Sequence, residues 1–240
     1  HDGADAARAH CDRLLAEGAD ILDIGGESTR PGAAAVPPGE ELRRVLPVLR
    51  HAVGLGCPVS VDTSDPGVID AALAVGVDIV NDVRALRRPG ALERVAAHPT
   101  AGVCLMHMPG EPREMQLAPR DADVVAEVRA FLAERLRAAT RAGIAAPRIV
   151  LDPGFGFGKT FEHNLALVRA LPALRALGQP LLAGWSRKGS LGRITGRDVD
   201  ERLAASLAAA IACVAQGAAI VRVHDVAATV DALKVWAALG

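Results

Sequence analysis

The chain has 240 residues, of which 50% are hydrophobic and 23% are charged, and its formal net charge is −1. This composition excludes a disordered chain, because disordered chains lack the apolar surface that offsets the entropy lost on folding. The small net charge and the absence of tyrosine give no reason to expect nucleic-acid binding.

The four cysteines are scattered singly along the chain. No pair has the close spacing of a zinc site or a redox motif, and a disulfide framework is unusual at this length, so we expect a reducing compartment, the cytoplasm. The longest apolar runs are of strand length or carry charges, so we expect no membrane span.

Short apolar runs alternate with alanine-rich stretches along the whole chain. The apolar runs predict seven strands, at residues 20–26, 59–63, 79–83, 102–108, 148–154, 181–186 and 218–225. The stretches around them predict eight helices, at residues 4–17, 39–53, 65–75, 89–98, 121–142, 163–177, 200–216 and 226–239. Glycines follow several of these helices, where a left-handed C-terminal cap is expected. They are Gly18, Gly54, Gly76, Gly143, Gly178 and Gly217.

This alternation predicts an α/β fold with a parallel sheet. Several strands are almost continuously hydrophobic, as is typical of parallel strands covered on both faces. A (β/α)8 TIM barrel needs eight strands, and here a helix comes first. We therefore expect a TIM barrel whose first strand and first loop lie upstream of His1, with residues 1–240 forming a single domain. The alternatives are a seven-strand barrel and an open sheet.

Polar residues stand at the ends of nearly all the predicted strands. Barrel enzymes place their chemistry there, and burying such groups is costly unless they are paired or bind a ligand. Three strand ends carry carboxylates or an amide, which suit a flat heterocycle with several N–H donors: Asp62, Asn81 and Asp152. The last two strands carry cationic side chains, where barrels often bind phosphate: Lys188, Arg222 and His224.

Other polar residues have simpler interpretations. Three aspartates are placed to cap helices, namely Asp65, Asp121 and Asp225. The glycine-rich run that ends in Lys159 lacks P-loop spacing, because Pro153 stands where the first glycine is needed. Lys159 itself is then either a solvated loop charge or a ligand.

The polar residues nearest the predicted strand ends are harder to assign. We interpret His107 as a hydrogen-bonded residue at the end of a strand rather than as a metal ligand, and Glu27 as a brace for its own loop. Asp23 and Asp82 remain open between structure and function.

The sequence resembles the dihydropteroate synthase family. The resemblance rests on seven motifs in family order, which together span nearly the whole chain: DILDIGGESTRPGA, VSVDTSDPGVI, IVNDVRAL, CLMHMPGEPREMQ, IVLDPGFGFGKTFEHN, SRKGSLG and VRVHDV. The resemblance implies a (β/α)8 barrel that condenses 6-hydroxymethyl-7,8-dihydropterin diphosphate with 4-aminobenzoate and releases pyrophosphate. It also implies Mg²⁺ as cofactor, sulfonamides as inhibitors and a homodimer built through the last helices.

The resemblance assigns roles to individual residues. The pterin-binding set is Asp62, Asn81, Asp152, Lys188, Met106 and Val83. The diphosphate ligands are Arg222 and His224, which with Lys188 form the catalytic group. The 4-aminobenzoate set is Thr29, Arg30, Pro31, Phe157, Ser186 and Gly189. The family's asparagine ligand to Mg²⁺ falls upstream of His1, so no metal ligand is assigned in this chain.

Two positions depart from the family pattern. Gly189 stands where many relatives have serine, and Trp185 is bulkier than usual. Two alternative functions stay open on sequence grounds. One is a catalytically silent pterin-binding paralogue, and the other is a protein related to the methyltetrahydrofolate:corrinoid methyltransferases, which bind no diphosphate.

Overall fold

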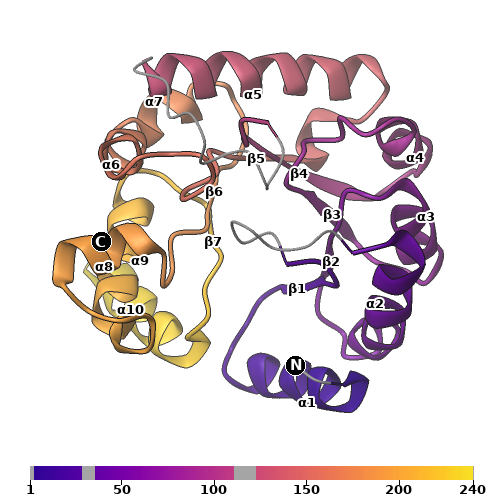
Figure 1. Cartoon of the computed structure of the whole chain (residues 1–240), viewed down its shortest axis with the longest axis horizontal. Coiled ribbons are helices and arrows are strands. Elements are labelled where there is room, and N and C mark those ends of the chain that lie inside the picture. The colour runs from indigo at the N-terminus through magenta and orange to yellow at the C-terminus, as the bar shows by residue number, and fades with distance from the viewer. Residues whose placement is uncertain (1–2, 29–35, 111–122, 240) are drawn as a thin grey trace. The chain divides into compact units, whose positions relative to one another are not determined.

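The computed structural model describes residues 3–28, 36–110 and 123–239 (Figure 1). The chain forms two compact units, one of residues 1–106 and 135–149, and the other of residues 107–134 and 150–240. Helix α5 (Val124–Arg141) begins in the second unit and ends in the first. None of the described helices is long and apolar enough to cross a membrane.

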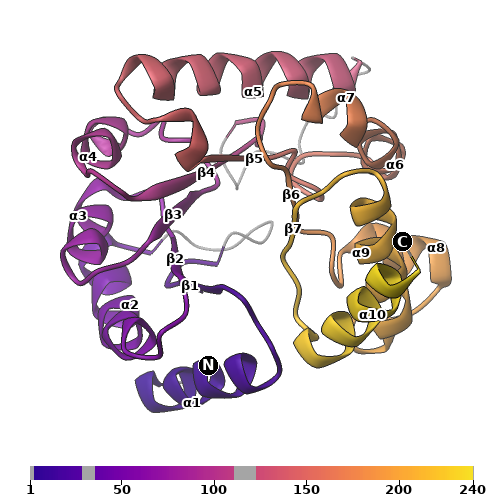
Figure 2. The same cartoon turned by 180° about the vertical axis from the view of Figure 1, so that it is seen from behind.

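The first unit alternates helices and parallel strands. In chain order its elements are α1 (Ala4–Ala16), β1 (Leu22–Gly25), α2 (Pro38–Val53), β2 (Val59–Asp62), α3 (Pro66–Ala74), β3 (Ile79–Asp82), α4 (Ala91–Ala97), β4 (Gly102–Met106) and the 3₁₀ turn η1 (Ala146–Arg148). Strands β1 to β4 pair in sequence order, each parallel to the next. Figures 1 and 2 show α2, α3 and α4 side by side along one face of these strands.

The strand register explains how this sheet presents its polar ends. One row across the sheet is apolar, where Ile24 pairs with Val61, Val61 with Val80 and Val80 with Val103. Val61, Val80 and Val103 are fully buried. The next row towards the carboxyl ends changes character, pairing Gly25 with Asp62, Asp62 with Asn81 and Asn81 with Cys104. On β2 and β3 the apolar row therefore gives way to polar residues at the carboxyl end, whereas β4 stays apolar and buried through Leu105 and Met106.

The second unit continues the same alternation. Its elements are β5 (Ile149–Asp152), α6 (Phe161–Arg169), α7 (Leu171–Arg175), β6 (Leu182–Ala183), α8 (Gly189–Thr195), the 3₁₀ turn η2 (Val199–Glu201), α9 (Leu203–Ala215), β7 (Ile220–Val221) and α10 (Val226–Ala238). Strands β6 and β7 are parallel, and a bridge between Leu151 and Leu181 joins β5 to the start of β6. Helix α9 contacts β7 as well as its neighbours α8 and α10.

All seven predicted strands are present in the described residues, but each is shorter than predicted. The difference is largest for β6 and β7, which have two residues each. Their predicted ends are polar residues that leave the hydrogen-bonded ladder and turn towards other partners, as described below for Ser186 and Asp225.

One predicted helix and one predicted glycine cap were wrong, and one helix was missed. The helix predicted at 163–177 is divided at Ala170 into α6 and α7, because Pro172 fits the first turn of a new helix and not the interior of a continuous one. Helix α8 was not predicted, since Gly189 and Gly192 lower the helix propensity of a seven-residue segment. Gly54 keeps a right-handed φ of −73°, and Gly56 takes the left-handed conformation instead.

Candidate active site

In the first unit, Asp62 and Asn81 stand directly opposite each other on neighbouring strands. Paired residues of a parallel sheet project to the same face, so the two side chains are neighbours, as the sequence predicted. The Asn81 side chain is buried and its Nδ2 donates to Oδ2 of Asp23 at 3.1 Å. Asp23 therefore orients the Asn81 amide, and this contact resolves the role that the sequence left open for Asp23.

Asp82, the last residue of β3, organises the loop that follows it. Its fully buried carboxylate accepts hydrogen bonds from the Ser64 hydroxyl and from the backbone N–H groups of Arg84 and Leu86, the latter two at 2.8 and 2.7 Å. Burial raises the pKa of Asp82, and these hydrogen bonds oppose that rise. The role of Asp82 is thus structural, and it acts on the loop that begins with Val83.

That loop contains two left-handed residues that are not glycine, Ala85 at φ 52° and Leu86 at φ 56°. Each costs about 1–2 kcal/mol relative to a right-handed conformation. Arg135 holds their carbonyl groups from α5, with its Nε 2.9 Å from the oxygen of Ala85 and its Nη2 3.4 Å from that of Leu86. Val83 is buried beside this braced segment.

The structure describes some of the remaining predicted residues and not others. Met106 is buried at the end of β4, in keeping with an apolar wall. Thr29, Arg30 and Pro31 lie outside the described residues, as does Asp121. Glu27 accepts from the backbone N–H of Val36 at 3.4 Å, which agrees with the predicted bracing role.

In the second unit, Asp152 ends β5 as a buried acceptor. Its Oδ1 accepts from the backbone N–H of Gly154 at 2.6 Å. Burial raises the pKa of Asp152 to about 6, against the opposing effects of that hydrogen bond and of the charges on Lys188, Lys159 and Arg222. Asp152 therefore shares its surroundings with two of the three predicted cationic residues.

Lys159 is neither solvated nor placed as a free ligand. Its Nζ lies 3.1 Å from Nδ1 of His107, 3.2 Å from the His107 carbonyl oxygen and 3.0 Å from that of Phe157. Burial lowers the pKa of Lys159 to about 7, with Asp152 and Glu127 opposing the shift. Lys159 thus fastens the glycine-rich loop to His107.

His107 is a hydrogen-bonded residue at a strand end, as predicted. Its ring packs edge-on against Phe131 with centroids 4.9 Å apart, and its Nε2 lies 3.6 Å from a carboxylate oxygen of Glu127. The glycine-rich loop passes so close to it that a Cβ on Gly154 would lie 2.0 Å from the His107 carbonyl oxygen.

Lys188 extends across the glycine-rich loop. Its Nζ lies 4.4 Å from the centre of the Phe157 ring, and a Cβ on Gly156 would lie 3.1 Å from its Cδ. The contact places a cation on an aromatic face, an arrangement that is attractive when water is excluded. The structure therefore brings together Lys188, which the sequence assigned to the pterin, and Phe157, which it assigned to 4-aminobenzoate.

Trp185 and Gly189, the two residues that depart from the family pattern, lie on either side of the segment 186–188. The Trp185 ring is buried and stacks on Phe155 with centroids 5.6 Å apart, and its Nε1 donates to Oγ of Ser190 at 2.7 Å. Trp185 therefore fixes the first turn of α8. Gly189 begins that helix, and a Cβ there would meet nothing within 4 Å.

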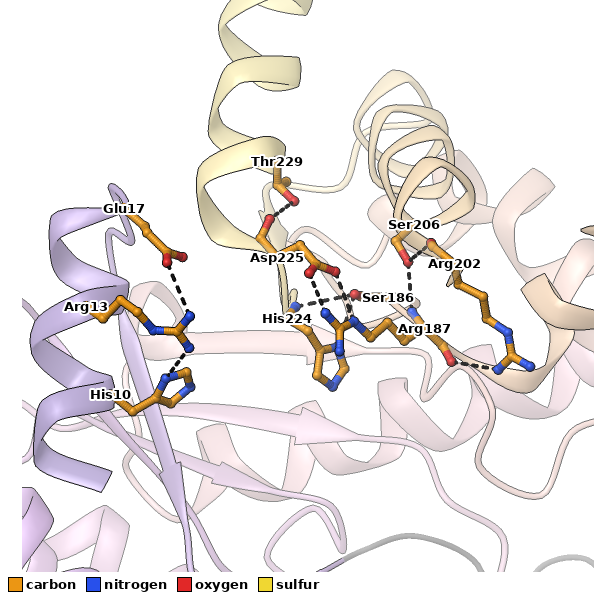
Figure 3. Close-up of polar contacts among 10 residues, drawn as sticks. All are labelled: His10, Arg13, Glu17, Ser186, Arg187, Arg202, Ser206, His224, Asp225 and Thr229. Carbon is orange, nitrogen blue, oxygen red and sulfur yellow. Dashed lines mark hydrogen bonds and ion pairs between the residues drawn. The ribbon is translucent and has the colours of Figure 1, made fainter. Parts of the chain in front are cut away.

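His224 follows β7 and contacts Ser186, which follows β6 (Figure 3). Oγ of Ser186 accepts from the His224 backbone N–H at 3.3 Å and lies 3.1 Å from its Nδ1. The hydroxyl hydrogen can then be donated to Nδ1, which leaves the ring hydrogen on Nε2 for an incoming anion. Burial, followed by the charges on Arg187 and Arg222, lowers the pKa of His224.

Arg222 immediately follows β7. Its backbone N–H donates to the Ala183 carbonyl oxygen at 3.0 Å, which extends the pairing of β6 with β7 by one residue. The backbone of Arg222 is therefore fixed by the hydrogen bonding between β6 and β7. Its charge affects both Asp152 and His224.

The expected cap at Asp225 was wrong. Asp225 precedes α10, yet its carboxylate makes no capping hydrogen bond and pairs instead with the Arg187 guanidinium (Figure 3). Asp65, by contrast, caps α3 as predicted by accepting from the N–H groups of Gly67 and Val68.

The comparisons with known proteins agree on the family to which this chain belongs. The pterin binding enzyme family matches residues 1–224. The chain is 55% identical to a dihydropteroate synthase of Neisseria meningitidis serogroup B, and the match covers 99% of this chain and 85% of that protein. The chain belongs to the pterin binding enzyme family.

Solved structures of relatives place the chain more closely in that family. One is the Xanthomonas albilineans dihydropteroate synthase with 4-aminobenzoic acid, at 55% identity and a TM-score of 0.94, matching 100% of this chain and 86% of that one. Another is the Yersinia pestis dihydropteroate synthase in a sulfonamide drug complex, at 42% identity and a TM-score of 0.96, with 100% and 87% covered. These matches confirm the (β/α)8 TIM-barrel fold class.

The family relationship also confirms the resemblance drawn from the seven motifs. The chain is an enzyme of folate synthesis, a transferase of the dihydropteroate synthase type. The relatives support this activity and give no support to the methyltransferase alternative.

Three functional-site residues were missed or left open by sequence reasoning: Asp82, Lys159 and Arg187. All three hold loops or neighbouring residues in place through contacts that a single sequence does not reveal. The one signal in the sequence is that each lies within two residues of an assigned site residue.

Proposed function

We propose that this chain joins the two substrates by alkyl transfer, with diphosphate as the leaving group. The C–O bond between the pterin methylene and the diphosphate breaks first, and its electron pair leaves with the diphosphate. The electron-rich dihydropterin stabilises the resulting carbocation. The amine of 4-aminobenzoate then forms the new C–N bond and releases its proton to solvent.

The observation that carries the proposal is the set of residues that ends β5 and follows β6 and β7. One buried acceptor, Asp152, is accompanied by the cationic residues Lys188 and Arg222, whose charges act on it. An acceptor suits the N–H edge of a pterin, and cations suit a departing diphosphate.

By resemblance, the residues proposed to bind the pterin ring are Asp62, Asn81 and Asp152, and the structural support is given for each unit by itself. Within the first unit the support is the register that pairs Asp62 with Asn81. Within the second it is the buried, hydrogen-bonded carboxylate of Asp152. Val83 and Met106 would supply the apolar walls, and both are buried.

The diphosphate is proposed to bind Arg222 and His224. A neutral His224 with its hydrogen on Nε2 donates to a phosphate oxygen, and Arg222 adds a permanent charge. Stabilising the leaving group and orienting the two partners then account for the catalysis, so no covalent enzyme intermediate and no general base are required.

The 4-aminobenzoate is proposed to lie against Phe157, Ser186 and Gly189, with Lys188 between the two substrates. The contact of Lys188 with the Phe157 ring supports a shared pocket wall. Thr29, Arg30 and Pro31 complete the proposed set by resemblance. Sulfonamides, as aminobenzoate analogues, would compete for the same position.

Mg²⁺ is proposed to arrive on the diphosphate. No group of three or more His, Cys, Asp or Glu residues among residues 3–28, 36–110 and 123–239 is arranged to hold a metal ion. Mg²⁺ commonly binds through substrate phosphates and one or two protein ligands. The described residues do not form a metal site by themselves.

A homodimer through the last helices is proposed from their surface. Several large apolar side chains between α8 and the residue that follows α10 are exposed: Ile194, Val199, Leu203, Val235, Trp236 and Leu239. Exposed apolar residues gathered in one part of a chain mark interaction surfaces. Sedimentation equilibrium with the charged variant Trp236→Glu would test the dimer, which should dissociate.

The activity is tested by mixing the protein with the dihydropterin diphosphate, 4-aminobenzoate and Mg²⁺ and measuring pyrophosphate release. The Arg222→Ala variant should lose at least 100-fold in kcat, about 3 kcal/mol of transition-state stabilisation. It should bind a pterin without diphosphate almost unchanged.

The matched control is Arg193→Ala, since Arg193 is exposed on α8 and forms an ion pair with the exposed Glu162. It should leave turnover unchanged. Pterin binding without any pyrophosphate release by the parent protein would refute the enzyme and identify a silent pterin-binding paralogue. Equal losses of pterin binding and turnover in Arg222→Ala would show that the anion site is misassigned.

A further inference from the structure

Arg187 lies between two residues that the proposed function uses, Ser186 and Lys188, yet it has no role in that function. We propose that Arg187 is a positioning residue whose ion pair with Asp225, here termed the 187–225 clamp, fixes Lys188 after β6 relative to His224 after β7. This inference rests on the proposed function for the roles of Lys188 and His224.

The backbone of Arg187 is strained. It has a φ of 56°, in the left-handed region that an arginine occupies at a cost of about 1–2 kcal/mol. Such conformations persist only where the surroundings over-determine them, and they concentrate at functional sites. A right-handed residue here would send the chain, and with it Lys188, in a different direction.

Two side chains from the following segment hold that conformation. Oγ of Ser206 on α9 accepts from the Arg187 N–H at 3.0 Å, and Nη1 of Arg202 donates to the Arg187 carbonyl oxygen at 3.1 Å. Ser206 is buried and its own hydroxyl donates to the Arg202 carbonyl oxygen at 2.7 Å. Figure 3 shows these contacts on one side of Arg187 and Asp225 on the other.

The side chain of Arg187 forms the clamp itself. Its Nε lies 3.0 Å from Oδ2 of Asp225, and its Nη2 contacts Oδ1, so the guanidinium and the carboxylate meet through two parallel hydrogen bonds. This geometry is specific to arginine, because an ammonium group cannot make both bonds in one plane. The hydrogen bond from Arg187 lowers the pKa of Asp225, which keeps the carboxylate ionised.

The clamp joins the two strand ends on which the proposed chemistry depends. Asp225 directly follows His224, and Ser186, whose hydroxyl contacts His224, directly precedes Arg187. Asp225 is in turn fixed because its carbonyl oxygen accepts from Oγ1 of Thr229 at 2.7 Å in the first turn of α10. A shift at Arg187 would therefore move Lys188 and His224 relative to each other.

The test is a double-mutant cycle of Arg187→Lys, Asp225→Asn and the combined variant. Arg193→Lys, a change of the same kind at the exposed pair with Glu162, serves as the matched control. We expect kcat to fall about 10–100-fold in each single variant, because misplacing reacting groups by about 1 Å costs up to that factor. The combined variant should be no slower than the slower single variant, since both changes break one contact.

Hydrogen exchange gives a second readout that needs no activity. Backbone amides at positions 187 and 224 should exchange at least tenfold faster in both single variants than in the parent or in Arg193→Lys. Backbone amides at positions 61 and 80, in the sheet of the first unit, should exchange as they do in the parent protein, which a general loss of structure would not allow.

Three outcomes would overturn the clamp: kcat of Arg187→Lys within twofold of the parent, losses that multiply in the combined variant, or unchanged exchange at positions 187 and 224. An inactive parent protein would refute the proposed function instead. In that case the exchange measurement alone decides the clamp.

Discussion

The buried carboxylate of Asp82 gives the sharpest stability prediction. In Asp82→Asn one carboxylate oxygen becomes an NH₂ group, so either the Leu86 N–H or the pair formed by Ser64 and Arg84 N–H loses its acceptor, whichever way the amide turns. A lost charge-assisted hydrogen bond together with an orphaned buried N–H costs about 3–5 kcal/mol. Asparagine is neutral, so the variant also avoids the cost of burying a charge, the same cost that raises the pKa of Asp82, and this offsets part of the loss in stability. We expect a net loss of about 2–3 kcal/mol.

Urea unfolding of the parent protein and the variant measures this loss. The control is Asp70→Asn on α3, since Asp70 is exposed and pairs with Arg94 at the surface, where an ion pair contributes about 0–1 kcal/mol. The variant should also bind pterin more weakly, because the strained Ala85–Leu86 segment adjoins Val83. A loss in Asp82→Asn no larger than that in Asp70→Asn would refute the view that Asp82 holds this loop.

Two further predictions concern the second unit. The pKa of Asp152 is raised to about 6, so its carboxylate becomes protonated as pH falls below 6. Pterin affinity, measured by calorimetry, should then fall about tenfold per pH unit. The Asp152→Asn variant should bind pterin weakly and without this pH dependence. A pterin affinity of the parent protein that stays constant from pH 7 to 5 would exclude Asp152 as the acceptor. Gly154→Ala would place a Cβ 2.0 Å from the His107 carbonyl oxygen at a φ of 71°, whereas Gly189→Ser meets nothing within 4 Å. Gly154→Ala should prevent folding or severely destabilise the folded protein, and Gly189→Ser should leave the melting temperature within about 2 °C of the parent value. Comparable melting temperatures for the two variants would contradict the close approach of the glycine-rich loop to His107.

The strands and their polar ends could be predicted because hydrophobic runs of strand length leave a clear pattern. Asp62 and Asn81 each stand at the point where such a run stops, and a parallel register brings equivalent ends together. The same pattern placed Asp152 at the end of β5.

The contacts that orient these residues could not be predicted, because they join positions far apart in the chain. Asp225 has the sequence context of a helix cap, and only the left-handed turn at Arg187 makes an ion pair the better use of its carboxylate. Lys159 has the context of a loop charge, and its partner His107 is 52 residues away. Helix α8 escaped prediction because its stability comes from tertiary contacts such as the Trp185–Ser190 hydrogen bond rather than from propensity.

Gly25 limits how the proposed pterin site at Asp62 could change its choice of heterocycle. It pairs with Asp62 across the sheet, and a methyl group there would lie 3.1 Å from the Cβ of Asp62 and 3.2 Å from its carbonyl oxygen. Any larger residue would push against the strand that carries the acceptor. Substitutions that adapt the site to a new ring system are therefore expected at positions other than 25.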